Sequence, residues 1–208
     1  MAGAVSPSLP VAQHTSRAWR IHEIAPEFRV EDVWALPTPG GPDDFDRLVE
    51  GFAAGDPERT GPLPVRVLFA LRWKLGELFG SGDEDDGVGS RLPTLRDRVP
   101  TDLREDRPLP DFSSLPFDPL YLTEDEFAGE IANRTMHGVL HLGWVPDGST
   151  GGYRGQMAVL VKPNGRAGDA YMAAIKPFRH LLIYPAMIRQ IGRKWREDGA
   201  FPSQTAAV

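Results

Sequence analysis

The chain has 208 residues, of which 41% are hydrophobic, with a formal net charge of −6 and no cysteine. This composition predicts one ordinary domain that buries roughly 70% of the surface of its unfolded chain. The acidic balance argues against a general nucleic-acid-binding protein. The absence of cysteine excludes disulfides, thiolate metal ligands and thiol nucleophiles, and it fits a cytoplasmic protein. Neither a signal peptide nor a run of about 18 apolar residues is found, so no membrane span is expected.

The first part of the chain is predicted to be a leader followed by a strand. Residues 1–18 are small and proline-containing, which favours a flexible leader before a domain over residues 19–200, with 201–208 as a tail. Residues 24–36 carry β-branched and aromatic side chains and end at Pro37, which predicts a strand.

Two helices and a long loop are expected next. Asp43 or Asp44 can cap a helix that runs to about Ala54, and leucines at helical spacing predict a second helix over 65–79. Residues 80–117 combine an acidic run with many prolines, which disfavour regular structure. This stretch is predicted to be a loop, either a lid over a binding site or a surface wrap.

The second half of the chain predicts an antiparallel meander followed by a long helix. The strand candidates cover 120–121 running into 126–133, then 135–145, 153–162 and 169–176. Asp147-Gly148 and Asn164-Gly165 lie between strand candidates and are strong hairpin signals. Apolar residues at helical spacing predict a helix from Pro177 to about Glu197, kinked at Pro185, that covers the sheet.

Four segments of this half carry a family resemblance. They are TMHGVLHLGW at 135–144, YRGQMAV at 153–159, YMAAIKPFRH at 171–180 and LLIYPAMIRQIGRKW at 181–195. The chain resembles, over about residues 27–196, an uncharacterised bacterial family catalogued as domain of unknown function 2867 and placed in the START/SRPBCC (Bet v 1-like) superfamily.

The resemblance implies an α+β helix-grip fold, in which a curved antiparallel sheet wraps around a long C-terminal helix and leaves a cavity. It transfers no catalytic residue. The superfamily includes lipid carriers, polyketide cyclases and aromatases, and hormone receptors, so the fold alone does not choose a function. Domains of this type accompany sugar-epimerase-like proteins, which leaves open a role as a partner module of an oxidoreductase system.

Alternation sorts the predicted meander into two faces. One face is apolar, with Met136, Leu140, Leu142, Trp144, Met157, Val159 and Val161. The other carries Glu126, Glu130, His137, Val139, His141, Arg154, Gln156 and Lys162. In one interpretation the apolar face meets the helix and the polar face lies in water. In the other, part of the polar face lines the cavity.

The second interpretation supplies candidate catalytic residues. Glu130, His137, His141 and Arg154 could provide the acid–base and anion-holding groups of a cyclase or dehydratase of secondary metabolism. A metal site is not expected, because residues four apart on a strand, such as His137 and His141, lie about 13 Å from each other.

The leading hypothesis is the binding of a small apolar or amphipathic molecule between the sheet and the C-terminal helix, without a cofactor. The residues predicted to contact this molecule are Trp144, Tyr153, Met157, Tyr171, Lys176, Phe178, Arg179, Leu182 and Tyr184. Lys176, Arg179 and His180 could also hold an anionic group at the start of the helix. The enzyme is the alternative, and a homodimer is left open.

Overall fold

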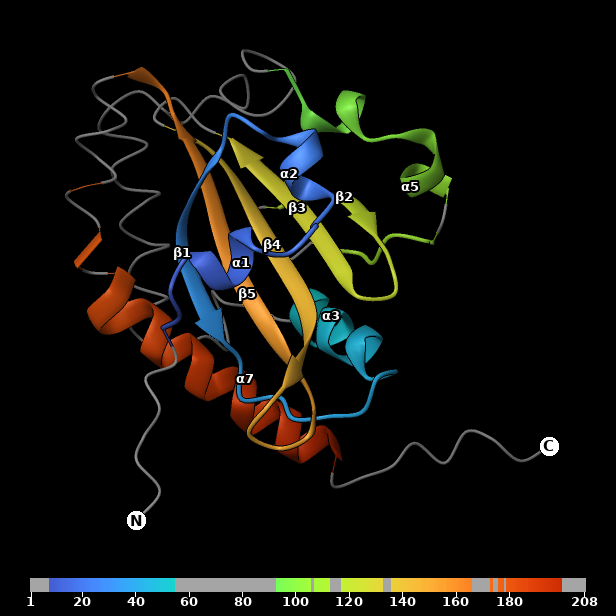
Figure 1. Cartoon of the computed structure of the whole chain (residues 1–208), viewed down its shortest axis with the longest axis vertical. Helices are drawn as coiled ribbons and strands as arrows, with labels where there is room; N and C mark the ends of the chain where they lie inside the picture. Colours follow the sequence, from blue (N-terminus) through green and yellow to red (C-terminus); the bar gives the residue numbers. More distant parts are fainter. Residues whose placement is uncertain are drawn as a thin grey trace.

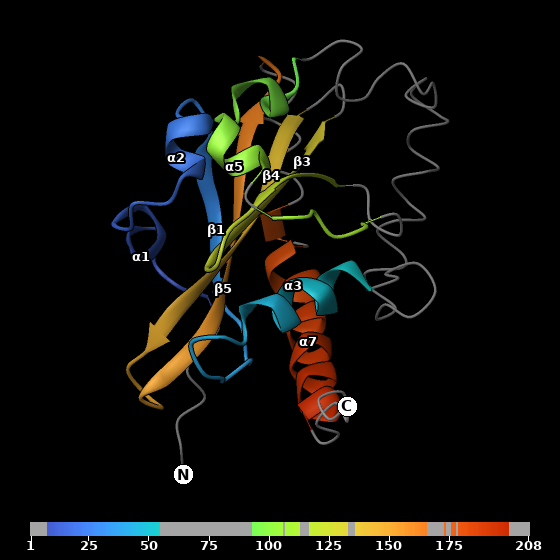
Figure 2. The same cartoon turned by 90° about the vertical axis from the view of Figure 1, so that its right-hand side faces the viewer.

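The computed structural model describes residues 8–54, 93–105, 107–112, 117–132, 136–165, 173, 176–177 and 179–199. These residues form one antiparallel sheet with helices on both of its faces (Figure 1 and Figure 2). The predicted α+β class is confirmed. Within this part of the chain no helix is both long and apolar enough to cross a membrane.

The sheet has five strands in the order β1-β5-β4-β3-β2, and every neighbouring pair is antiparallel. Their bounds are β1 Arg29–Ala35, β2 Asp118–Leu122, β3 Glu126–Ala132, β4 Met136–Asp147 and β5 Gly152–Pro163. The predicted meander is therefore confirmed from β2 to β5, and β1 joins it along the free edge of β5. The hairpin at Asp147 is also confirmed, since this carboxylate accepts hydrogen bonds from the backbone N–H and the hydroxyl of Ser149.

Two predicted boundaries differ from the structure. The segment 120–133 forms two strands rather than one, because the Thr123 hydroxyl accepts a 3.0 Å hydrogen bond from the backbone N–H of Glu126 and turns the chain between β2 and β3. The strand predicted over 24–36 begins only at Arg29, because residues 21–24 form the short helix α2.

One face of the sheet packs against α3, Phe45–Ala53, and α7, Tyr184–Gly199 (Figure 2). Both helices were predicted. The cluster between them and the sheet contains Leu140, Leu142, Trp144 and Met157 together with Phe45, Leu48, Tyr184, Ile188 and Trp195. The predicted apolar face of β4 therefore meets the C-terminal helix, as expected from the period-two pattern.

The opposite face is also covered, by α1 Ala12–Thr15, α2 Ile21–Ile24, the 3₁₀ turn η2 Leu95–Arg98 and α5 Thr101–Glu105. The expectation of a polar face in water holds at Lys162, whose side chain is 49% exposed, but it is wrong for the centre of the sheet. There Glu126, Glu130, His137, His141 and Gln156 are each at most 5% exposed. The cover contributes its own apolar side chains, Trp19, Ile21, Ile24, Phe28, Leu95, Val99 and Leu103, which need a surface to pack on.

This cover changes the expected roles of two segments. Residues 8–18 were assigned to a flexible leader, yet Leu9 donates a 2.8 Å backbone hydrogen bond to Val33, and His14 is completely buried. Residues 80–117 were expected to lack regular structure, yet the described positions include η2 and α5. Prolines precede both elements, where a missing N–H costs nothing. The rest of 80–117 and the predicted helix 65–79 lie outside the described residues.

The last helix begins with a wider turn than expected. A π-helical turn, η3 Arg179–Ile183, leads directly into α7. Pro185 has no N–H and its ring crowds the carbonyl four residues back, so a local departure from α-helical geometry replaces the expected kink inside the helix. The strand predicted over 169–176 is not found at Ala173 and Lys176, which are helical, while 169–172, 174 and 175 lie outside the described residues.

Gly143 shows how tightly the cover packs on the sheet. A Cβ atom at this position would lie 2.7 Å from two atoms of the Trp19 ring. We expect Gly143→Ala to cost about 1–3 kcal/mol of unfolding free energy, because the indole must shift. Gly148→Ala is the control, since nothing lies within 4 Å of a Cβ there. Urea denaturation of both variants measures the difference, and equal midpoints would contradict the packing.

Candidate functional site

Among the described residues, three histidines contact a carboxylate on a strand of the sheet. Glu126 pairs with His141 at 3.1 Å, Glu130 pairs with His137 at 2.8 Å, and Asp32 pairs with His180 at 2.5 Å. The first pair lies under α2 and the second under η2, and the third joins β1 to the first turn of the C-terminal helix. In the described part of the chain no three His, Asp or Glu side chains are arranged to hold a metal ion.

Glu126 is the hub of the first pair. Its carboxylate accepts hydrogen bonds from the backbone N–H of Arg20 at 2.9 Å and of Ile21 at 3.0 Å, from Nε2 of His141, and from the hydroxyl of Tyr121. Burial alone would raise the pKa of Glu126, but the hydrogen bonds and charge of His141 and the other donors lower it overall. The carboxylate is therefore ionised and ties the start of α2 to the sheet.

His14 extends this network. Its Nε2 lies 3.1 Å from Nδ1 of His141, although the two residues are 127 positions apart in the chain. Burial, then the nearby His141, His22 and Arg17, lower the pKa of His14 to about 2. Its second ring nitrogen, Nδ1, is buried and has no hydrogen-bond partner among the described residues. His14 is therefore held neutral inside the protein.

Glu130 forms a similar arrangement four residues further along β3, on the same face of the sheet. Its carboxylate accepts from Nε2 of His137, from the backbone N–H of Leu95 at 3.0 Å and from the hydroxyl of Thr94. Burial opposes ionisation, but these donors lower the pKa of Glu130 overall. This pair fastens η2 to the sheet.

Asp32 collects three side chains from the beginning of the last helix. Its carboxylate accepts from Nε2 of His180 at 2.5 Å and from the hydroxyl of Tyr184 at 3.0 Å, and Nη2 of Arg179 lies 3.3 Å away. Burial, then the Asp32 charge, raise the pKa of Tyr184, which stays a donor. Arg179 and His180, expected to hold an anionic ligand, instead bind a carboxylate of their own chain.

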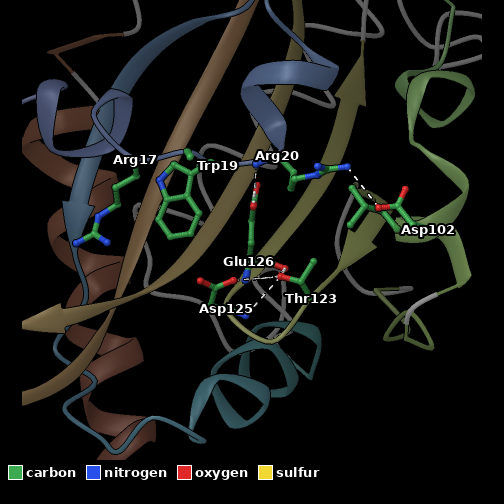
Figure 3. A pocket seen from close by; sticks show the side chains of 9 residues that line it. Arg17, Trp19, Arg20, Asp102, Thr123, Asp125 and Glu126 are labelled. Atoms are coloured by element: carbon green, nitrogen blue, oxygen red, sulfur yellow. Dashed lines mark hydrogen bonds and ion pairs between the residues drawn. The ribbon is translucent and has the colours of Figure 1, made fainter.

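A pocket of about 590 Å³ opens on the α1–α2 face, and we call it the Trp19 pocket. Figure 3 shows Glu126 at its centre, pointing toward the backbone of Arg20, whose side chain reaches Asp102. The lining residues are Arg17, Ala18, Trp19, Arg20, Asp102, Leu103, Thr123, Asp125 and Glu126.

Some of the charged side chains that line this pocket form ion pairs, and others do not. Arg20 lies 3.4 Å from both Glu23 and Asp102. Arg17, in contrast, has no ion pair with any described residue, and its guanidinium lies 5.8 Å from the centre of the Trp19 ring. The pocket thus offers an indole wall beside an available cation.

The predicted catalytic residues are only partly brought together. Glu130 and His137 contact each other, and His141 contacts Glu126, which was placed on the polar face without a role. Arg154 lies near the β4–β5 hairpin, paired in register with Val145, and its guanidinium is 3.8 Å from Asp147. It contributes to neither histidine pair.

The residues predicted to bind a ligand are scattered along the α7 face. Trp144, Met157 and Tyr184 are buried in the core, and the Trp144 indole N–H donates to the carbonyl of Gly41 at 2.8 Å. Tyr153 packs at the edge of this cluster, while Lys176 is exposed and Leu182 is 50% exposed. Tyr171 and Phe178 lie outside the described residues.

Sequence reasoning missed the parts played by Asp32, His14 and Trp19. A carboxylate inside the apolar strand segment 28–36 was a usable signal for Asp32, since a buried charge needs partners. The other two lie in or next to the assumed leader, where no periodic pattern points to burial.

The comparisons with known proteins give one match. No curated protein and no solved structure matches the sequence. The model of the family described as "Protein of unknown function (DUF2867)" matches residues 24–187, which is more than half of the chain. The chain therefore belongs to the DUF2867 family of proteins of unknown function.

Proposed function

We propose that this protein binds a small amphipathic molecule in the Trp19 pocket. The observation that carries the proposal is the pocket itself, whose volume of about 590 Å³ falls within the range of roughly 300–1,000 Å³ typical of small-molecule sites. Trp19 and Leu103 offer apolar surface, and the four donors to Glu126 hold the floor rigid.

Arg17 is the feature of the pocket that favours a ligand with an acidic group. Asp102 is engaged by Arg20, and the Glu126 carboxylate is saturated with donors. Asp125 also lines the pocket and accepts a 3.3 Å hydrogen bond from the Thr123 hydroxyl. Arg17 is therefore the lining cation that has no ion pair among the described residues. An anionic group can approach its guanidinium while the apolar part of the molecule lies along the indole.

This location differs from the sequence-based expectation of a cavity between the sheet and the last helix. There the described side chains form a continuous apolar cluster, including Trp34, Leu142, Met157, Ile188 and Trp195. The helix-grip architecture of the START-like superfamily remains our proposal for the fold, supported by the antiparallel sheet and the long C-terminal helix on one of its faces. A cytoplasmic location and a homodimer remain predictions from the sequence.

Two single variants distinguish the two locations. Native mass spectrometry of the purified protein, followed by titration with 1-anilinonaphthalene-8-sulfonate as an amphipathic anion, measures binding. We expect Arg17→Glu to weaken binding at least about tenfold, since it replaces the attracting charge by a repelling one. Leu182→Glu, on the α7 side, should leave binding unchanged. Weaker binding in Leu182→Glu but not in Arg17→Glu would place the ligand on the α7 face. Unchanged binding in both variants would contradict both locations.

An enzyme remains the second candidate, favoured by the three carboxylate–histidine pairs. A cyclase or dehydratase that uses Glu130, His137, His141 and Arg154 predicts that single alanine changes abolish turnover. The geometry gives this set little support, because both glutamate–histidine pairs are buried and bound to the backbone of the cover. A reactive pair has to be sought where a histidine reaches the surface.

A further inference from the structure

The three carboxylate–histidine pairs differ in the exposure of the histidine. The side chain of His141 is 0% exposed and that of His137 is 6% exposed, whereas that of His180 is 31% exposed. The carboxylate of Asp32 beside it is completely buried. Only this pair, among the described residues, combines a sealed carboxylate with an imidazole that a small molecule can reach.

The contacts of Asp32 fix the orientation of the His180 ring. Nε2 of His180 lies 2.5 Å from one carboxylate oxygen, while Tyr184 and Arg179 hold the other oxygen at 3.0 Å and 3.3 Å. A carboxylate can only accept, so Nε2 carries the proton of this bond. In the neutral ring the lone pair is then on Nδ1, because the hydrogen bond made by one ring nitrogen sets which nitrogen carries the proton.

The backbone on both sides of this pair is irregular. His180 lies in the π-helical turn η3, and Asp32 follows a register shift that starts at Val30 in β1. Both π-helical turns and β-bulges are frequent at functional sites. The Trp34 ring, whose centre lies 5.5 Å from that of His180, has a buried indole N–H without a hydrogen-bond partner among the described residues.

We propose that His180, oriented by Asp32, is a proton-transfer residue for a small molecule bound beside the first turn of the last helix. Nδ1 takes a proton from an O–H group or from a C–H group next to a carbonyl. The resulting imidazolium is stabilised by the Asp32 carboxylate and returns the proton to the product, so no oxidant or metal enters the step. This site lies on the opposite face of the sheet from the Trp19 pocket and does not depend on it.

The first test measures whether Nδ1 is available. Diethyl pyrocarbonate carbethoxylates an imidazole nitrogen that has a free lone pair, and peptide mass mapping separates the five histidines. In the full-length protein we expect His180 to react at least about tenfold faster than His137 and His141. Equal rates at the three positions would overturn the proposal, because the nitrogen would then be blocked.

The second test measures reactivity with p-nitrophenyl acetate. Nδ1 attacks the ester carbonyl, p-nitrophenolate leaves, and water hydrolyses the acyl-imidazole. We expect His180→Gln to lower the rate of nitrophenolate release at least about tenfold, while His22→Gln leaves it unchanged. His180 is partly exposed, so its replacement spares the fold, which circular dichroism checks. Equal rates in the two variants would overturn the proposal without affecting ligand binding in the Trp19 pocket.

Discussion

We expect the unfolding free energy of the natural chain to fall as the pH drops below 6.5, and we expect the His14→Gln variant to show a smaller decrease over the same pH interval. The pKa of His14 is lowered from 6.5 to about 2 in the folded protein. The unfolded chain therefore binds a proton that the folded chain rejects, and each pH unit below 6.5 costs about 1.4 kcal/mol. Between pH 6.5 and 4.5 this amounts to about 2–3 kcal/mol from one side chain.

Urea unfolding at several pH values measures this effect as a slope. Glutamine does not titrate, so the curve of the His14→Gln variant should be flatter than that of the natural chain over this interval. The variant also loses packing and the contact with His141, so its absolute stability is lower, but the slope is independent of that offset. Gln13→Ala is the control, because Gln13 is an exposed neighbour in α1 that does not titrate, so this variant should keep the slope of the natural chain. Parallel curves for His14→Gln and the natural chain would show that His14 accepts protons in the fold.

Replacing Glu126 by glutamine should cost about 3–5 kcal/mol of unfolding free energy. The carboxylate accepts four hydrogen bonds, two from backbone groups at the start of α2 and two from the side chains of Tyr121 and His141. An amide has one oxygen and brings two donors of its own, so some of these buried donors lose their acceptor. The change should loosen the α1–α2 cover and with it the Trp19 pocket.

Thermal and urea denaturation measure this cost. Glu124→Gln is the control, because Glu124 is exposed on the same turn and its replacement should change stability by no more than about 0.5 kcal/mol. The pKa of Glu126 is lowered from 4.5, so its contribution is complete above pH 4.5 and is lost as the pH falls further. The difference between Glu126→Gln and the natural chain should therefore shrink below pH 4.5. A difference that stays constant with pH would contradict the ionised hub.

Local patterns were enough to predict most of the sheet and the helices on one face. The alternation in β4 and β5 assigned Leu140, Leu142 and Met157 to the face that meets α7, and Asp147-Gly148 marked the hairpin between these strands. These features depend on the period of the backbone and on turn chemistry, both of which act within a few residues.

The sequence also predicted which residues make up the polar face of the sheet, but it did not predict that this face is buried. Glu130 and His137 were selected together, and they do form a pair. The interpretation that placed them in water failed, because the burial of one sheet face depends on what packs against it. The segments that do so, 8–28 and 93–103, are interrupted by prolines and form helical elements of only four or five residues, which are too short to show a periodic pattern.

The sequence by itself therefore determined the order of the strands in the meander, the apolar face of the sheet and the helix that covers it. Tertiary structure alone decided that His14 meets His141 across 127 positions of the chain, and that Asp32 meets His180 across 148. Such contacts join segments whose separate patterns carry no information about one another. The buried carboxylates of Glu126 and Glu130 keep a lowered pKa only because the folded chain brings donors to them from distant segments.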